Sequence, residues 1–299
     1  MEKVSFYSEG CKLVGYLRVP STAGKKVPGI VCCHGYSGMI ELMLKGVAER
    51  LTEAGYATLI FYHRGLGESE GPRSRIIPWE QAQDARNAIT YLQTRTEVDP
   101  DKIGLYGTSL GGCTVAWAGA IDVRAKCVVS TGGIGNCERW LKSLRRYYEW
   151  TQFLKDIEED RINRVLTNTS RYVHPFDIVI HDPDGDNLIR PHIDSFGQKW
   201  GSKGYPLETA DAMLISKPEE LVDQISPRAV LFIHLDNDVL VPPQESWSMY
   251  EKAKEPKRIV IIEGKEYQHH DVYSFRKTIL FDKVMAAAID WYKEYLPTE

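Results

Sequence analysis

The stretch Lys102–Cys113, KIGLYGTSLGGC, decides the fold. Residues 103–106 form a short apolar run that predicts a strand, and residues 113–120 predict a helix soon after it. Ser109 stands at the apex of the intervening turn, with a glycine two positions before it and another two positions after it. A turn this sharp needs small residues there, because a Cβ would collide with the neighbouring strand or helix. We therefore expect the Ser109 hydroxyl to stand above a sheet edge as a candidate nucleophile.

Composition narrows the classes of protein to consider. The chain has 299 residues, 43% of them hydrophobic, which is enough for one large core. Its net charge is −4 and it has no basic stripe, so we expect no nucleic-acid partner. Neither the first ten residues nor any apolar run predicts a secretion signal or a membrane span. The cysteines form no C-x-x-C pair and predict reduced, mostly buried thiols in a cytoplasmic protein: Cys11, Cys32, Cys33, Cys113, Cys127 and Cys137.

Predicted strands and helices alternate along most of the chain. This rhythm favours an α/β fold with a mainly parallel, doubly wound sheet, in which ligands bind at the carboxyl ends of the strands. A hairpin is predicted for residues 4–19. Further strands are predicted at 29–33, 56–62, 127–130, 230–235 and 259–262, and helices at 41–54, 79–95 and 278–296.

Residues 131–226 interrupt the alternation of predicted strands and helices. Nearly a hundred residues are too many for a loop in a compact domain. They predict a helix or helix pair at 138–166, a strand-like piece at 176–180 and a polar turn at 182–187. We interpret 131–226 as an inserted, partly helical cap over the sheet edge, and 1–130 with 227–299 as the core.

A nucleophilic serine needs a base, and the base needs an acid that fixes its tautomer. In this architecture the acid and then the base follow the serine along the chain. Asp238 follows the predicted strand 230–235 and is favoured over Asp236, which is interpreted as a turn residue. The loop after 259–262 carries His269 and His270, of which His269 is favoured as the base.

The turn His34-Gly35-Tyr36 follows an early strand and predicts one half of an oxyanion hole. Gly35 allows the backbone to approach closely, and the N–H of Tyr36 would join that of Leu110. One such donor is worth about 3 kcal/mol of transition-state stabilisation. His34 is interpreted as a residue that fixes this loop rather than as a base.

These motifs together resemble the α/β-hydrolase superfamily. HGYSG resembles its oxyanion turn, GTSLGG its nucleophile elbow and SPRAVLFIHLDNDVLVPPQES its acid loop, over about residues 1–130 and 208–297. QHHDVY resembles the G-H-x-D-x-Y ending of the superfamily, whose first histidine is catalytic, which points to His269. The nearest subgroup is the dienelactone-hydrolase-like and acyl-esterase-like hydrolases. The chain departs from the pattern at His63, where many relatives have aspartate and where we favour a packing role, and at Gln268, which replaces a glycine.

We expect no cofactor and no metal. DPDGDN at 182–187 lacks the later ligands of a calcium loop, and His174, His181 and His192 match no standard metal spacing. The resemblance implies a serine hydrolase acting on a small or medium acyl substrate, most simply a carboxylic ester. Cleavage of a C–C bond, lactone, thioester or amide by the same residues is the alternative, and a small-molecule receptor is the non-enzymatic one. A homodimer is left open.

Overall fold

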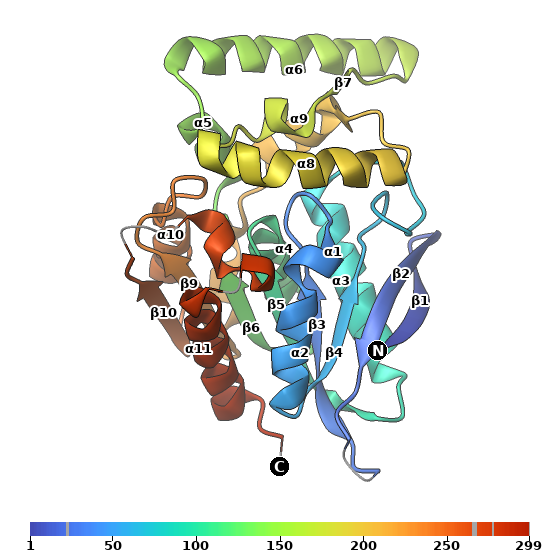
Figure 1. Cartoon of the computed structure of the whole chain (residues 1–299), viewed down its shortest axis with the longest axis vertical. Coiled ribbons are helices and arrows are strands. Elements are labelled where there is room, and N and C mark those ends of the chain that lie inside the picture. The colour runs from blue at the N-terminus through green and yellow to red at the C-terminus, as the bar shows by residue number, and fades with distance from the viewer. Residues whose placement is uncertain (22–23, 265–267, 277, 299) are drawn as a thin grey trace.

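The computed structural model describes residues 1–298 apart from 22–23, 265–267 and 277. Within these residues, eight strands form one sheet in the order β1-β2-β4-β3-β5-β6-β9-β10 (Figure 1). Strand β2 is antiparallel to both β1 and β4, and every other pair is parallel, which confirms the mainly parallel sheet. The strands are β1 (Glu2–Ser8), β2 (Cys11–Arg18), β3 (Val27–Cys33), β4 (Ala57–Phe61), β5 (Val98–Thr108), β6 (Ala125–Thr131), β9 (Ala229–Leu235) and β10 (Lys257–Ile262).

Helices cover both faces of the sheet (Figure 1). In β9, Leu231 and Ile233 pack with α2 (Lys45–Glu53) and α11 (Ile279–Tyr295), whereas alternate residues pack into a second cluster on the opposite face. The helices of that second face are α3 (Pro78–Gln93), α4 (Leu110–Ile121) and α10 (Gln244–Lys252). Strands buried on both faces therefore read as continuous apolar runs, and the doubly wound arrangement is confirmed.

Two predicted boundaries differ from the structure. The helix predicted at 41–54 is divided at Leu44 into α1 (Ile40–Met43) and α2. Strand β5 begins at Val98 and includes Pro100, five residues before the predicted start, because Val98 pairs with Val27 across a register shift. A shift of this kind accommodates a proline, which has no N–H to donate to a strand ladder.

The chain leaves the sheet after β6, and the elements between residues 137 and 214 lie over the carboxyl ends of the strands (Figure 1). The predicted helix pair is present as α5 (Cys137–Ser143) and α6 (Tyr147–Thr167). The division of the chain into a core and a cap at 130/131 and 226/227 stays a prediction. The remaining elements of this segment are β7 (Tyr172–Val173), α7 (Pro175–Ile178), α8 (Pro183–Lys199), β8 (Tyr205–Pro206), α9 (Leu207–Leu214) and the short 3₁₀ helices η1 (Pro218–Glu220) and η2 (Val222–Ile225).

Two predictions within this segment were wrong. The piece at 176–180 falls mostly in the short helix α7 and is not a strand. The polar turn at 182–187 is the start of α8, because the Asp182 side chain accepts hydrogen bonds from the N–H groups of Asp184 and Gly185, and Pro183 occupies the first helical position. The acidic and proline residues that look like a loop are therefore helix-start signals.

Two further expectations can be compared with the structure. All six cysteines are free thiols, and five of them are buried. Among the described helices, none combines the length and apolar character needed to cross a membrane.

Ion pairs around two buried carboxylates attach the start of the inserted segment to the body. Arg139 of α5 donates to the carboxylates of Glu219 and Glu245, in each case at 2.8 Å. Glu245 also accepts hydrogen bonds from the N–H groups of Gly135 and Asn136. Burial alone would raise the pKa of Glu219, but hydrogen bonds from Arg139, Ser248 and Lys252 lower it to about 2.

We expect Glu219→Gln to destabilise the protein at pH 7. The carboxylate of Glu219 has a lower pKa in the folded state than its ordinary value, so its contribution to stability is present above about pH 4.5 and is lost as the pH falls toward 2. Urea unfolding of both proteins between pH 7 and pH 3 should therefore show a gap in unfolding free energy that narrows below about pH 4.5. A gap that is independent of pH would contradict an ionic role.

Candidate active site

Ser109 occupies a strained turn between β5 and α4. Its backbone angles are φ 55° and ψ −122°, in a region that side-chain-bearing residues seldom adopt. A Cβ on Gly107 would lie 2.1 Å from the carbonyl oxygen of Gly111, and one on Gly111 would lie 2.2 Å from that of Cys33. The steric reason for both glycines is therefore confirmed in this structure.

The structure brings Asp238 and His269 together at the ends of β9 and β10. Nδ1 of His269 lies 2.6 Å from Oδ2 of Asp238, and both side chains are almost fully buried. The other carboxylate oxygen, Oδ1, accepts hydrogen bonds from the N–H groups of Leu240 and Val241 at 3.0 and 2.8 Å. The carboxylate is thus fixed in place by the loop that follows β9.

Electrostatics favour an ionised Asp238. Burial would raise its pKa, but His269, His234 and the N–H of Val241 together hold that pKa below its ordinary value. An ionised carboxylate makes Nδ1 of His269 the protonated nitrogen and leaves Nε2 as the acceptor. Asp236, in contrast, is exposed and accepts a hydrogen bond from the N–H of Gly264, as expected of a residue that stabilises a loop.

Tyr273 also reaches the site, and the sequence interpretation did not single it out. Its hydroxyl lies 3.1 Å from Nε2 of His269. Burial and then the charge of Asp238 raise its pKa, while a hydrogen bond with Ser109 acts in the opposite direction. The tyrosine of QHHDVY, four residues after His269 and just past the short 3₁₀ helix η3 (His269–Val272), was the available signal.

The turn predicted to contribute an oxyanion donor packs directly against the serine. A Cβ built on Gly35 would lie 3.1 Å from Cβ of Ser109, so any other residue at 35 would crowd the serine. The next residue, Tyr36, is held from above by the inserted segment. Its hydroxyl donates to the carbonyl of Pro175 at 3.2 Å, and its own carbonyl accepts from the hydroxyl of Tyr205 at 3.4 Å.

His34 fixes this turn from behind. Its Nδ1 lies 2.7 Å from the carbonyl oxygen of Gly35, and its Nε2 accepts a hydrogen bond from the N–H of His63 at 3.3 Å. Burial, followed by the neighbouring His63, lowers the pKa of His34 to about 3. A histidine that is neutral at physiological pH and bonded to its own turn has the loop-fixing environment that was predicted.

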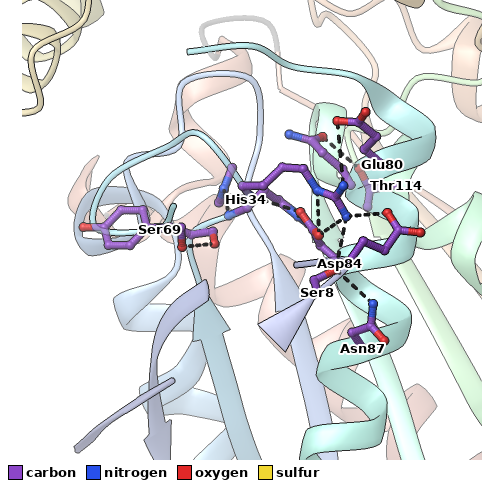
Figure 2. Close-up of polar contacts among 12 residues, drawn as sticks. Ser8, His34, Ser69, Glu80, Asp84, Asn87 and Thr114 are labelled. Atoms are coloured by element: carbon purple, nitrogen blue, oxygen red, sulfur yellow. Dashed lines mark hydrogen bonds and ion pairs between the residues drawn. The ribbon is translucent and has the colours of Figure 1, made fainter. Parts of the chain in front are cut away.

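A polar cluster lies next to these histidines (Figure 2). Nδ1 of His63 is 3.4 Å from the buried carboxylate of Asp84, and its ring packs edge-on against those of His34 and Phe61. The same carboxylate accepts hydrogen bonds from the backbone and guanidinium of Arg64. Its pKa, which burial would raise, is held low by His63 and Arg64. His63 is thus fully buried in a paired cluster, in keeping with the packing role.

A cavity of about 40 Å³ is lined by Ser109, His269 and Tyr273. Its remaining walls are largely apolar, and they come from α1, α5, α8 and the loops at the strand ends. They include Met43, Trp140, Ile189, Ile193 and Leu240. The serine and the histidine therefore border a small, mostly apolar space.

His270 belongs to the wall of this cavity rather than to the charged pair. It stacks on His181 of the inserted segment with 5.6 Å between ring centroids. Burial, and then the neighbouring His269, places its pKa well below the ordinary value. In the part of the chain that the structure describes, no three histidine, cysteine or acidic side chains are grouped as a metal site would need.

Comparisons with known proteins agree with this architecture. The model of the family described as "Serine aminopeptidase, S33" matches residues 25–171, which include Ser109 and the turn at 34–36. Among solved structures, an α/β hydrolase (GrgF) from Penicillium sp. sh18 superposes with a TM-score of 0.79 at 23% identity, covering 99% of this chain and 98% of that one.

Curated relatives extend over almost the whole chain. An uncharacterized 31.7 kDa protein of Escherichia coli, from the traX-finO intergenic region, is 28% identical over 97% of both chains. A thiohydrolase (aneE) of Aspergillus aculeatus is 26% identical over 96% of this chain and 91% of its own. The matched family, the sheet order and the serine turn agree with one another. The chain has the α/β-hydrolase fold and is similar in sequence to serine hydrolases.

Proposed function

We propose that the protein hydrolyses a carboxylic ester of a small or medium acyl group through an acyl-enzyme on Ser109. One observation carries the proposal. Nδ1 of His269 lies 2.6 Å from the Asp238 carboxylate, and the His269 ring lines the same cavity as Ser109. In this arrangement Nε2 accepts the proton of the Ser109 hydroxyl as Oγ attacks the substrate carbonyl.

The steps that follow use the same groups. The imidazolium formed at His269 gives its proton to the departing alcohol, and Asp238 stabilises the imidazolium while remaining ionised. A water molecule, deprotonated by His269, then attacks the acyl-enzyme and releases the acid and free Ser109. The N–H groups of Tyr36 and Leu110 hold the oxyanion in both tetrahedral intermediates. The contact of Gly35 with Ser109 supports this role for the first of them.

Tyr273 should assist without being essential. Its hydroxyl lies 3.1 Å from Nε2 of His269, where it helps to hold the ring in its orientation. We expect Tyr273→Phe to lower kcat by roughly tenfold and to shift the acid limb of the pH–rate profile, because His269 loses a neighbour at its reacting nitrogen. The pH dependence of kcat/KM checks this. An unchanged profile and an unchanged rate would show that Tyr273 only packs.

Thioester hydrolysis is the second candidate, and the relatives favour it. Several curated relatives bear the names thiohydrolase, polyketide transferase or acyltransferase, which are statements about those proteins. The same residues would serve, since a thiolate leaves the tetrahedral intermediate more readily than an alkoxide. Cleavage of an amide would use the same residues, and the description of the matched family, a serine aminopeptidase, names that reaction for its members. Cleavage of a C–C bond or a lactone would also use these residues.

A panel of matched butyryl substrates distinguishes these reactions. Ethyl butyrate, the corresponding thioester, a lactone and an amide should be compared by kcat/KM with purified protein and with Ser109→Ala. We expect the ester to be cleaved with a rate that depends on Ser109. A preference for the thioester would favour the second candidate. Absence of turnover for every substrate, together with tight binding of one, would favour a receptor.

The setting that we propose is cytoplasmic, because all six cysteines are free thiols, as a reducing compartment requires. The partner that we propose is a small acyl substrate. A cofactor, nucleic acid and a membrane are not part of the proposal, and a homodimer stays open.

A further inference from the structure

A second and larger cavity lies beside the one at Ser109. Its volume is about 240 Å³, and it is formed between α8 of the inserted segment and the loop that follows β4. The two cavities share Ser37 and Ile193 as lining residues, so they adjoin at the residue that follows Tyr36. A group attached to a carbonyl at Ser109 would reach the larger cavity by passing between these two side chains.

The walls of the larger cavity are rich in aromatic side chains. Phe196 and Trp200 of the α8 end lie at 63° to one another with 6.3 Å between ring centroids, and Tyr205 adds a third ring. Tyr62 lies behind the first two, at 6.2 and 6.3 Å. Aromatic rings arranged edge to face form favourable walls for another aromatic ring.

One cation in these walls has no acidic partner. Arg73 donates from Nη1 to the carbonyls of Gly65 and Gly67 and from Nη2 to that of Ser69. Among the described residues, no carboxylate lies within ion-pair distance of it, and burial lowers its pKa. Asp194, in the same wall, already faces His174 at 3.1 Å.

These hydrogen bonds do not use all the N–H donors of the Arg73 guanidinium. A guanidinium has five N–H donors, and the carbonyls take both on Nη1 and one on Nη2. The remaining donors are the N–H of Nε and one N–H of Nη2, the two nitrogens with which an arginine can bind a carboxylate side-on. An anionic group in the cavity would supply the negatively charged partner that Arg73 lacks.

We propose that this larger cavity is a substrate subsite for an aromatic ring bearing a carboxylate, with the ring between Phe196, Trp200 and Tyr205 and the carboxylate on Arg73. The inference rests on the proposed function, because it makes the group in this subsite part of the molecule that Ser109 attacks. The substrate is then an extended ester with a small part at Ser109 and an aromatic acid part under α8.

Gly197 provides a way to fill the subsite without touching the residues at Ser109. It lines the larger cavity, and a Cβ built there would meet only Ser202, at an ordinary 3.6 Å. Gly197→Ala and Gly197→Leu should occupy increasing parts of the cavity. Ser195 is exposed on the same helix, so Ser195→Leu is a matched control for the helix itself.

The test is the binding of 6-hydroxy-2-naphthoate and of its uncharged amide to the full chain, by calorimetry. We expect the acid to bind about tenfold more tightly than the amide, and Gly197→Leu to weaken the acid about tenfold or more, with Gly197→Ala intermediate and Ser195→Leu unchanged. Absence of saturable binding, equal binding of acid and amide, or equal binding to all variants would overturn the proposal.

Turnover separates this inference from the function on which it rests. Ethyl butyrate has no ring, so its kcat/KM should be the same in all three variants, which also shows that they fold. Methyl 6-carboxy-2-naphthoate and 6-carboxy-2-naphthyl acetate place the carboxylate-bearing ring on the acyl or the alcohol side. We expect one of them to lose at least tenfold in kcat/KM in Gly197→Leu. If the butyrate is cleaved but neither aromatic ester responds to Gly197→Leu, the subsite is wrong. If the acid binds but no ester is cleaved, the proposed function fails instead.

Discussion

Ser109→Ala is expected to lower kcat by about 10⁴-fold or more while leaving substrate binding nearly unchanged. The variant removes one oxygen atom from a residue that is only 8% exposed, so the turn and the cavity should survive. The residual rate should come from the oxyanion donors and from substrate positioning, which act without the nucleophile. Single-turnover kinetics with an activated ester would show the loss of the acylation burst.

Ser130→Ala is the matched control. Its hydroxyl is fully buried on the neighbouring strand β6, and within the described residues that hydroxyl has no hydrogen-bond partner. Ser130→Ala removes a serine Oγ, as Ser109→Ala does, but at a position in the sheet away from Nε2 of His269. We expect kcat to stay within about twofold of the parent value. Comparable losses in both variants would mean that serine deletion disturbs the sheet rather than the chemistry.

Asp238→Asn is expected to have the second largest effect, a loss in kcat of roughly 10⁴-fold. The amide keeps an oxygen for the N–H groups of Leu240 and Val241, so the loop should remain in place. The uncharged amide no longer holds the proton of His269 on Nδ1. His269 then carries its proton on Nε2 and cannot accept the proton of Ser109. Asp236→Asn, on the exposed side of the same loop, should leave kcat unchanged.

The pH dependence of stability gives this prediction a second readout. The pKa of Asp238 in the folded protein is below its ordinary value, so the ionised carboxylate stabilises the fold at neutral pH. That contribution is lost as the pH falls through the lowered pKa. We therefore expect Asp238→Asn to be less stable than the parent at pH 7 and to approach it in acid, as measured by urea unfolding.

The sheet could be predicted because its signals are local. The strands at 29–33, 127–130 and 230–235 are continuous apolar runs, and such runs lie in parallel sheets that are covered on both faces. The two glycines on either side of the serine at 107–111 indicate a sharp turn in which a Cβ would collide, and the structure has that turn. The candidate residues also follow strands, so their approximate positions at one sheet edge follow from topology alone.

The inserted segment was less predictable, for physical reasons. Helix α8 begins in DPDGDN, where Asp182 caps the first turn and Pro183 starts it, so the composition of a loop conceals a helix. Pro191 lies inside this helix, which a local pattern would treat as its end. The tertiary contacts of Ile189 and Ile193 with the body stabilise it instead. The position of Tyr273 depends on how the loop after β10 folds, which residue types alone do not specify.

The most direct test of the central claim is covalent labelling of the nucleophile. The purified full chain should be treated with a fluorophosphonate and analysed by intact-mass and peptide mass spectrometry. We predict one adduct per chain, located on Ser109, with no labelling of Ser109→Ala and slower labelling of Asp238→Asn. An unmodified Ser109 in a folded protein, or an adduct on another residue, would contradict the account.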